Sequence, residues 1–178
     1  MSGLSETDGV VTIVAATEAS LDAEDRGAVA LAESLGLKPP TSWPPEHNDA
    51  RTRDWMRGLL RANPDDPGCG AWYVVADGRP IGTCGYKGPP DDKGDVEIGY
   101  SVIETEQRRG YGAAAVALLV RRAFRDPRVR SVSAETLPSL IASQKVLSRN
   151  GFILTGSRMD EEEGEVIRFV LTRGDQPT

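Results

Sequence analysis

The chain has 178 residues, which is the length of one domain with a sizeable hydrophobic core. Hydrophobic residues make up 39% of it and charged residues 27%, an ordinary composition for a soluble globular domain. The formal net charge of −6 at pH 7 argues against a nucleic-acid-binding protein, because such proteins need a basic face.

The two ends of the chain are polar and are expected to form flexible tails, at residues 1–9 and 173–178. The first tail lacks the basic and apolar segments of a signal peptide, and no apolar run approaches the roughly 18 residues of a membrane span. We therefore expect a cytoplasmic protein with no membrane partner. Its two cysteines, Cys69 and Cys84, are expected to stay free in that compartment.

The first third of the chain predicts a strand followed by two helices. Residues 10–15 are mostly β-branched and apolar, as in a strand. Residues 20–35 carry apolar side chains at helical spacing, with Ser20 placed to cap the start and Gly36 to end the helix. After a proline-rich loop, a second helix is predicted at residues 46–62.

The middle of the chain predicts three consecutive strands, at residues 71–76, 80–86 and 95–103. Asp77-Gly78, between the first two, is a typical hairpin turn. A polar loop separates the second strand from the third.

The last third alternates helices and strands. Helices are predicted at residues 110–124 and 138–149. Strands are predicted at residues 129–136, 152–158 and 166–172.

This order of elements predicts an α/β fold. Short turns between consecutive strands indicate antiparallel pairing, and the strand–helix–strand unit around residues 110–124 adds a parallel pair. We expect helices that flank a mixed, mostly antiparallel central sheet, in a single domain over residues 10–172.

The segment Gln107-Arg108-Arg109-Gly110-Tyr111-Gly112 joins a predicted strand to the start of a predicted helix. Helix N-termini expose unpaired N–H groups and a partial positive charge, and they bind diphosphates well. The two glycines let a ligand approach the backbone, and the two arginines add positive charge. A glycine-containing turn with solvated arginines would give the same pattern, so the loop alone leaves both interpretations open.

The same loop also matches the dinucleotide spacing G-x-G-x-x-A through Gly110, Gly112 and Ala115, with Glu135 in place of a ribose ligand. In that motif the first glycine follows the strand almost at once, whereas polar residues 104–109 intervene here. Only about 60 residues of the predicted domain follow Gly110, too few to complete a doubly wound sheet. Both features argue against a nucleotide-dependent oxidoreductase.

The loop matches the acyl-CoA signature (Gln/Arg)-x-x-Gly-x-(Gly/Ala), with Gln107, Gly110 and Gly112 at its fixed positions. Through this signature and its surroundings, the chain resembles the GNAT acetyltransferase superfamily over about residues 10–172. The segment from Ser143 to Phe152, with Ser-x-x-Val before Asn-Gly-Phe, is similar to the branch that contains the ribosomal-protein N-terminal acetyltransferases.

The resemblance implies a GNAT fold whose fourth and fifth strands splay apart and hold the pantetheine arm of acetyl-CoA. Backbone groups near Val102 and Ile103 would hydrogen-bond this arm, and N–H groups of residues 108–113 would hold the pyrophosphate. The expected cofactor-binding residues are Val102, Ile103, Gln107, Arg108, Arg109, Gly110, Tyr111, Gly112, Ala113 and Ser143.

Similar enzymes transfer the acetyl group directly to an amine, which must first lose a proton. Glu97 and Glu135, on the strands before and after the loop, are candidate bases, and each also fits a solvated or paired surface residue. Of the two, Glu97 is the preferred base. Many family members have a tyrosine proton donor where this chain has Leu147, and an asparagine where it has Leu140. These departures leave Ser143 as the candidate donor near the CoA sulfur, or as a small residue packed against the cofactor.

The sequence therefore predicts an N-acetyltransferase that moves an acetyl group from acetyl-CoA to a primary amine, on a protein N-terminus or a small molecule. The alternative is a non-catalytic acyl-CoA-binding or sensor domain, which the missing tyrosine and asparagine favour. No metal site is expected, because His47 is the only histidine and lies near no cysteine. A monomer or a homodimer is expected.

Overall fold

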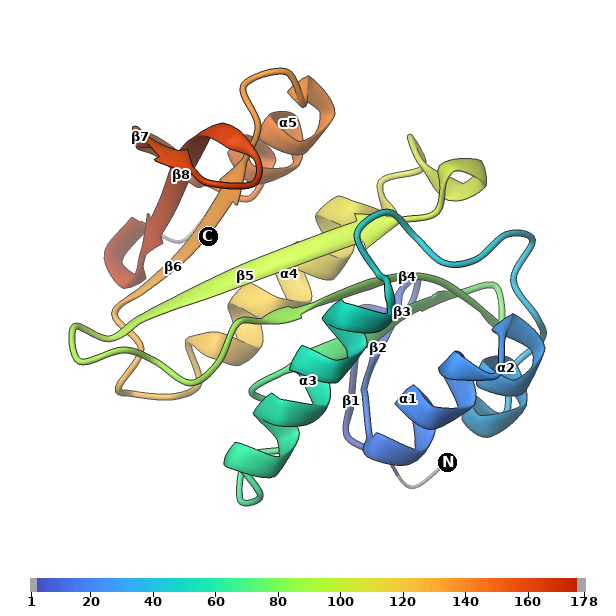
Figure 1. Ribbon diagram of the computed structural model, residues 1–178. Helices are drawn as coiled ribbons and strands as arrows, with labels where there is room; N and C mark the ends of the chain where they lie inside the picture. Colours follow the sequence, from blue (N-terminus) through green and yellow to red (C-terminus); the bar gives the residue numbers. More distant parts are fainter. Residues whose placement is uncertain (1–2, 176–178) are drawn as a thin grey trace.

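The computed structural model describes residues 3–175. Within this part the chain forms eight strands and five α-helices around one sheet (Figure 1). The strands are β1 (Ser5–Thr7), β2 (Thr12–Ala15), β3 (Ala71–Ala76), β4 (Arg79–Tyr86), β5 (Asp95–Val102), β6 (Ser131–Thr136), β7 (Ile153–Asp160) and β8 (Gly164–Thr172). The helices are α1 (Glu18–Asp25), α2 (Ala28–Leu35), α3 (Ala50–Ala62), α4 (Tyr111–Ala123) and α5 (Ile141–Arg149).

The sheet has the order β1-β2-β3-β4-β5-β6-β8-β7, and only β5 and β6 pair in parallel. Helix α4 covers one face, where its apolar residues join the larger hydrophobic core. Helices α1 and α2 cover the other face through a smaller core, and α3 lies beside them (Figure 1). The predicted fold class, a mixed and mostly antiparallel sheet flanked by helices, is confirmed.

The parallel pairing between β5 and β6 stops before either strand ends. Its last register pair is Ile98 with Ala134, although β5 continues to Val102 and β6 to Thr136. Beyond this point the two strands diverge, and β5 stays paired only with β4 on its other side. The splayed strands leave one edge of β5 without a partner strand, and this edge is where the candidate site opens.

The N-terminal segment is not the tail that the sequence predicted. Strand β1 pairs antiparallel with β2 at the edge of the sheet, and the Arg125 guanidinium donates two hydrogen bonds to the Glu6 carboxylate, at 2.6 and 2.8 Å. Between the strands, the Asp8 carboxylate accepts the N–H groups of Val10 and Val11 and closes the turn. Strand β1 has only three residues, which are polar and mostly exposed, so the hydrophobic pattern of the sequence did not predict it.

The other predicted tail is described only in part. Residues Arg173–Asp175 form a short 3₁₀ turn, in which the Arg173 guanidinium donates to the carbonyls of Phe124 and Val129. Residues 176–178 lie outside the described part of the chain.

The first predicted helix is in fact two helices. Gly27 adopts φ 119°, a conformation that interrupts α-helix, and α2 begins directly after it. Thr17, and not Ser20, caps α1, since its hydroxyl accepts the Ser20 N–H while the Ser20 hydroxyl accepts the Thr17 N–H.

Two further helices begin later than predicted. Helix α3 starts at Ala50, because the Asp49 side chain caps it by accepting the Thr52 N–H. Helix α5 starts at Ile141, because residues 137–140 form a turn onto which the Gln144 amide folds back. In residues 3–175 no helix is long and apolar enough to cross a membrane.

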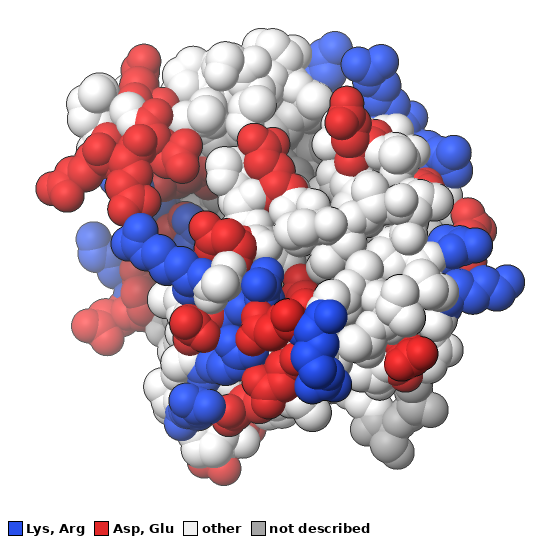
Figure 2. All heavy atoms as spheres, turned by 45° about the vertical axis from the view of Figure 1, so that its right-hand side comes forward, with Lys and Arg blue, Asp and Glu red and all other residues white. Residues whose placement is uncertain are grey.

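Charged side chains of both signs are interspersed over the face that carries α1 and α3 (Figure 2). On this face Arg53 pairs with Asp25 at 2.6 Å, and Arg61 pairs with Glu18 at 2.6 Å. Figure 2 shows no broad basic area there.

Candidate functional site

A cleft of about 1090 Å³ opens where β5 and β6 diverge. Its walls come from the end of β5, the loop before α4, the first turns of α4 and α5, the start of α3 and the β7–β8 hairpin. Most of the residues that the sequence predicted as functional therefore meet in one place. Those that line the cleft are Val102, Gln107, Arg108, Gly110, Tyr111, Gly112, Ala113, Glu135 and Ser143.

The loop that precedes α4 has a fixed backbone shape. A 3₁₀ turn at Glu104–Glu106 follows β5, and the Gln107 amide donates back to the Val102 carbonyl at 2.9 Å. Arg108 and Gly110 both adopt the left-handed conformation, with φ 64° and φ 82°. A Cβ at Gly110 would meet nothing within 4 Å, so its glycine is needed for backbone conformation and not for space. Gln107 thus shapes the loop from within.

Six consecutive N–H groups in this loop, those of residues 108–113, have no acceptor among the described residues. They precede and begin α4, where the partial charge of the helix is positive. Such a row of unpaired donors at a helix N-terminus binds anions, above all phosphates. The Arg108 side chain lines the same cleft, whereas Arg109 pairs with Glu106 at 3.3 Å and does not line it.

Ile103 does not fit the cofactor-binding role expected of it. Its N–H donates to the Ile81 carbonyl at 2.9 Å, its carbonyl accepts the Glu106 N–H at 3.0 Å, and its side chain is buried in the core. Because backbone groups alternate in direction along a strand, Val102 and Tyr100 are the residues whose backbone faces the free edge of β5. The expected backbone contact therefore moves from Ile103 to Val102 and Tyr100.

The first turn of α5 also lines the cleft. The N–H groups of Ala142 and Ser143 have no acceptor within residues 3–175, and both residues line the cleft. Tyr100 of β5 reaches across to this turn, with its hydroxyl 3.0 Å from the Ser143 carbonyl oxygen and 2.9 Å from Ser143 Oγ. Sequence reasoning missed Tyr100, because it looked like one more apolar residue of an alternating strand.

Leu147 and Leu140, at the two positions where this chain departs from the family pattern, lie in different surroundings. Leu147 is 0% exposed and belongs to the core beneath α5. Leu140 is exposed at the mouth of the cleft. A side chain at position 147 in this conformation points into the core and away from the cleft.

The two candidate bases are held in ion pairs. Arg158 donates to both oxygens of Glu135, at 2.9 and 2.6 Å, and this pairing lowers the pKa of the Glu135 carboxyl. Glu97 bonds to the Lys87 ammonium, and its side chain is 25% exposed. Glu135 and Lys87 line the cleft, whereas Glu97 does not, so Glu135 is the carboxylate that the geometry places at the site.

Aromatic and acidic side chains also line the cleft. Trp55 of α3 is 47% exposed and lines it together with His47, Asp160 and Glu163. The other two tryptophans do not line the cleft: partly buried Trp43 donates to the buried Glu24 carboxylate, and Trp72 is fully buried. Within residues 3–175 no group of His, Cys, Asp or Glu is arranged to hold a metal ion.

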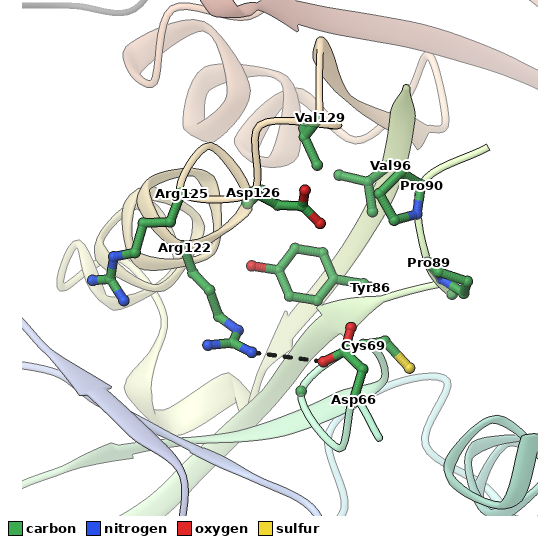
Figure 3. Close-up of a pocket in the computed structure, with 13 residues that line it drawn as sticks. Asp66, Cys69, Tyr86, Pro89, Pro90, Val96, Arg122, Arg125, Asp126 and Val129 are labelled. Carbon is green, nitrogen blue, oxygen red and sulfur yellow. Dashed lines mark ion pairs between the residues drawn. The ribbon is translucent and has the colours of Figure 1, made fainter. Parts of the chain in front are cut away.

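A second cavity, of about 310 Å³, lies at the C-terminal end of α4 (Figure 3). Figure 3 shows Tyr86 between Arg122 of α4 and Pro90 of the loop after β4. Arg122 stacks on the Trp72 ring at 5.0 Å and pairs with Asp66 at 3.8 Å, while the Tyr86 hydroxyl donates to the Leu119 carbonyl at 2.6 Å. Both cysteine thiols are free and buried, and burial raises the pKa of each.

The dinucleotide alternative is wrong on topology. A doubly wound sheet needs successive parallel strands, and this sheet has one parallel pair. The residue proposed as a ribose ligand, Glu135, has both oxygens bonded to Arg158.

Comparison with known proteins agrees with this geometry. A family profile described as "Acetyltransferase (GNAT) domain" matches residues 19–153. The chain is 28% identical over 136 residues to the uncharacterized N-acetyltransferase YjdG of Bacillus subtilis (strain 168), covering 75% of this chain and 80% of that protein.

Two solved structures share the fold at lower identity. Mycobacterium smegmatis RimJ, in complex with CoA-disulfide, has a TM-score of 0.69 at 21% identity and covers 96% of this chain and 85% of its own. RimL, a ribosomal L7/L12 α-N-protein acetyltransferase in complex with coenzyme A, has a TM-score of 0.71 at 17% identity and covers 94% of this chain and 96% of its own. Since the family profile covers well over half of the chain, the protein belongs to the GNAT acetyltransferase family.

Proposed function

We propose that the protein transfers the acetyl group of acetyl-CoA to a primary amine, on a protein N-terminus or a small molecule. The observation that carries this proposal is the row of six unpaired N–H groups at residues 108–113, at one end of the cleft beside the free edge of β5. The N–H groups would hold the pyrophosphate, and the edge of β5 would hydrogen-bond the amides of the pantetheine arm.

The thioester would then lie deeper in the cleft, near the point where β5 and β6 meet. The amine nitrogen attacks the carbonyl carbon, the C–S bond breaks, and CoA leaves as a thiolate while the nitrogen loses a proton to a base. Positioning and backbone N–H groups that polarise the carbonyl supply most of the acceleration. No metal takes part in this scheme.

Glu135 is better placed than Glu97 to receive the proton, because it lines the cleft. Its pairing with Arg158 lowers its pKa, so it is a weak base that stays ionised and attracts an ammonium. We expect the proton to leave through water toward this carboxylate. Glu97 stays the second candidate, acting through Lys87 and the water of the cleft.

The relatives support an amine as acceptor. RimL is described as an α-N-protein acetyltransferase of ribosomal L7/L12. The structurally similar AAC(6')-Ib was solved in complex with ribostamycin and coenzyme A. Aromatic Trp55 and the acidic Asp160 and Glu163, which line this cleft, suit an amine-bearing acceptor. We keep the cytoplasm as the expected location and a monomer or homodimer as the expected assembly.

Calorimetry with acetyl-CoA and a pair of glycine variants tests the loop. Gly110→Asp places a side chain on a φ of 82° and a carboxylate beside the phosphates, so we expect acetyl-CoA binding to be lost. Gly78→Asp is the matched control, because Gly78 has a similar φ of 70°, a Cβ there would also meet nothing within 4 Å, and the residue does not line the cleft. Equal affinity of Gly110→Asp and wild type would refute the loop assignment.

The alternative, a non-catalytic acyl-CoA sensor, differs from an enzyme in turnover. We expect thiol release from acetyl-CoA when the protein is offered a panel of peptides with free N-termini, polyamines and aminoglycosides. Binding of acetyl-CoA without thiol release above the rate with denatured protein, across the whole panel, would favour the sensor.

A further inference from the structure

The phenol of Tyr100 bridges β5 to the first turn of α5 at the centre of the cleft. Its hydroxyl lies 3.0 Å from the Ser143 carbonyl oxygen and 2.9 Å from Ser143 Oγ, and both residues line the cleft. The phenol that the family pattern puts at position 147 is absent, and position 147 faces the core. Tyr100 brings a phenol to α5 from the strand instead.

The geometry allows two arrangements of the hydroxyl protons. A carbonyl oxygen only accepts, so when Tyr100 donates to the Ser143 carbonyl, Ser143 Oγ must donate to Tyr100. When the Tyr100 proton turns to Ser143 Oγ, the serine proton is released for another acceptor. This change needs only rotation of the two hydroxyl hydrogens about the C–O bonds of Tyr100 and Ser143, and no heavy atom moves.

The leaving sulfur is the acceptor that suits the released proton. In the proposed reaction it gains a full negative charge as the C–S bond breaks. The unpaired N–H groups of Ala142 and Ser143 give the first turn of α5 a positive partial charge beside the same hydroxyl. A hydroxyl donor and a helix N-terminus at one point are what a thiolate needs for stabilisation.

We propose that Tyr100 is a positioning residue for acetyl transfer, which orients the Ser143 hydroxyl so that it donates a hydrogen bond to the departing sulfur of CoA. This inference rests on the proposed function. No net proton passes from the protein in this step: the C–S electron pair stays on sulfur, and the thiolate leaves stabilised by the hydrogen bond.

Tyr100 acts as a hydrogen-bond donor and not as an acid. Burial raises the pKa of its hydroxyl to about 12, whereas a free thiol has a pKa of about 8.5. Proton transfer from the phenol to the thiolate would thus be uphill by roughly three orders of magnitude. The pH profile of turnover should accordingly show no ionisation that belongs to Tyr100.

The thiol pKa of enzyme-bound CoA tests the proposal without requiring turnover. It is followed by the ultraviolet absorbance of the thiolate during a pH titration, in wild type, Tyr100→Phe, Ser143→Ala and the double variant. We expect both single variants to raise this pKa and to lower kcat about five- to tenfold, with little change in KM for acetyl-CoA. The double variant should resemble either single one, since the residues act together.

Tyr73→Phe is the matched control, because it also removes a buried phenol of a central strand, one that donates to the Glu24 carboxylate and does not line the cleft. It should cost stability but leave the bound thiol pKa and kcat as in wild type. A thiol pKa unchanged in Tyr100→Phe and Ser143→Ala, or effects that add in the double variant, would overturn the proposal. If Tyr100→Phe fails to fold, Ser143→Ala decides by the same measurement.

Failure of the proposed function has a different signature. If wild type binds no CoA, the loop assignment and this inference both fall. If wild type binds CoA and acetylates amines while Tyr100→Phe matches it in thiol pKa and kcat, only the role of Tyr100 is refuted.

Discussion

At position 147, packing in the core accounts for the leucine, and no role in the cleft is needed to explain it. Leu147 is fully buried in the core between α5 and the sheet, so its side chain has no path to the cleft. The GNAT resemblance gave the position a catalytic expectation, and only the direction of the side chain removes it. The leucine at position 147 therefore fills the core and does not line the cleft.

Restoring the family's tyrosine should harm the protein. We expect Leu147→Tyr to lower the free energy of unfolding by about 1–3 kcal/mol, because it overpacks the core and buries a hydroxyl. Turnover should not rise. Urea unfolding and steady-state rates check both expectations, with the volume-conserving Leu147→Met as control. A gain in turnover for Leu147→Tyr would show that the side chain reaches the cleft.

Some residues of the cleft could be predicted from a local sequence pattern, and others could not. The loop was predictable, since glycines and a polar approach between a strand and a helix mark a phosphate-binding turn. Tyr100 was not, because its role depends on α5, which lies 43 positions away along the chain. Ile103 was misplaced by one step, and a one-residue shift in a strand turns the backbone groups to the opposite edge.

Helix α3 lines the cleft, and an ion-pair cluster joins it to α1. The Arg57 guanidinium contacts three carboxylates, those of Asp22 at 3.0 Å, Asp54 at 2.8 Å and Asp25. Its side chain is 10% exposed, so these pairs are less screened than ordinary surface pairs. The cluster fixes α3, which carries Trp55 into the cleft.

We expect Arg57→Ala to lower the free energy of unfolding by about 1–3 kcal/mol, since it leaves the carboxylates of Asp22 and Asp54 without their arginine partner, while Asp25 keeps Arg53. It should also raise KM for the amine, because α3 loses its anchor. Arg61→Ala is the control: Arg61 pairs with Glu18 on the same two helices but is 65% exposed, and its loss should matter much less. Equal effects of the two variants in urea unfolding would contradict the argument.

At the level of elements, the sequence predicted the central strands and α4 within one or two residues at each end. The errors lie where polar groups decide the boundary: the Asp49 and Thr17 caps, the Gly27 break and the edge strand β1. Hydrophobic periodicity reports burial, and these boundaries are set by hydrogen bonds at exposed positions.

Across the whole molecule, carboxylates paired with arginine make stability depend on pH. A hydrogen bond from Arg125 lowers the pKa of Glu6, and one from Arg158 lowers that of Glu135, both from the ordinary glutamate value of 4.5. A hydrogen bond from Arg53 likewise lowers the pKa of Asp25 from the ordinary aspartate value of 3.8. A depressed pKa in the folded state adds stability above the unfolded value, and this stability is lost as pH falls through the folded value.

We therefore expect the melting temperature to be nearly constant from neutral pH to about pH 5 and to fall steeply below it. Circular dichroism melts at successive pH values check this. Glu6→Gln should melt lower at neutral pH and show a shallower acid decline, because it removes the ion pair between β1 and Arg125, just after α4. An acid decline as steep as in wild type would exclude Glu6 as a contributor.

If the unpaired amides at residues 108–113 hold the pyrophosphate, as proposed, they act far along the cofactor from the C–S bond that breaks. The affinity that this loop provides is therefore the same for acetyl-CoA and for the product CoA. The product thiol should then compete with its own precursor at near-equal strength. The rate of such an enzyme depends on the ratio of acetyl-CoA to CoA. Acetylation should therefore follow this ratio more closely than the total concentration of coenzyme A.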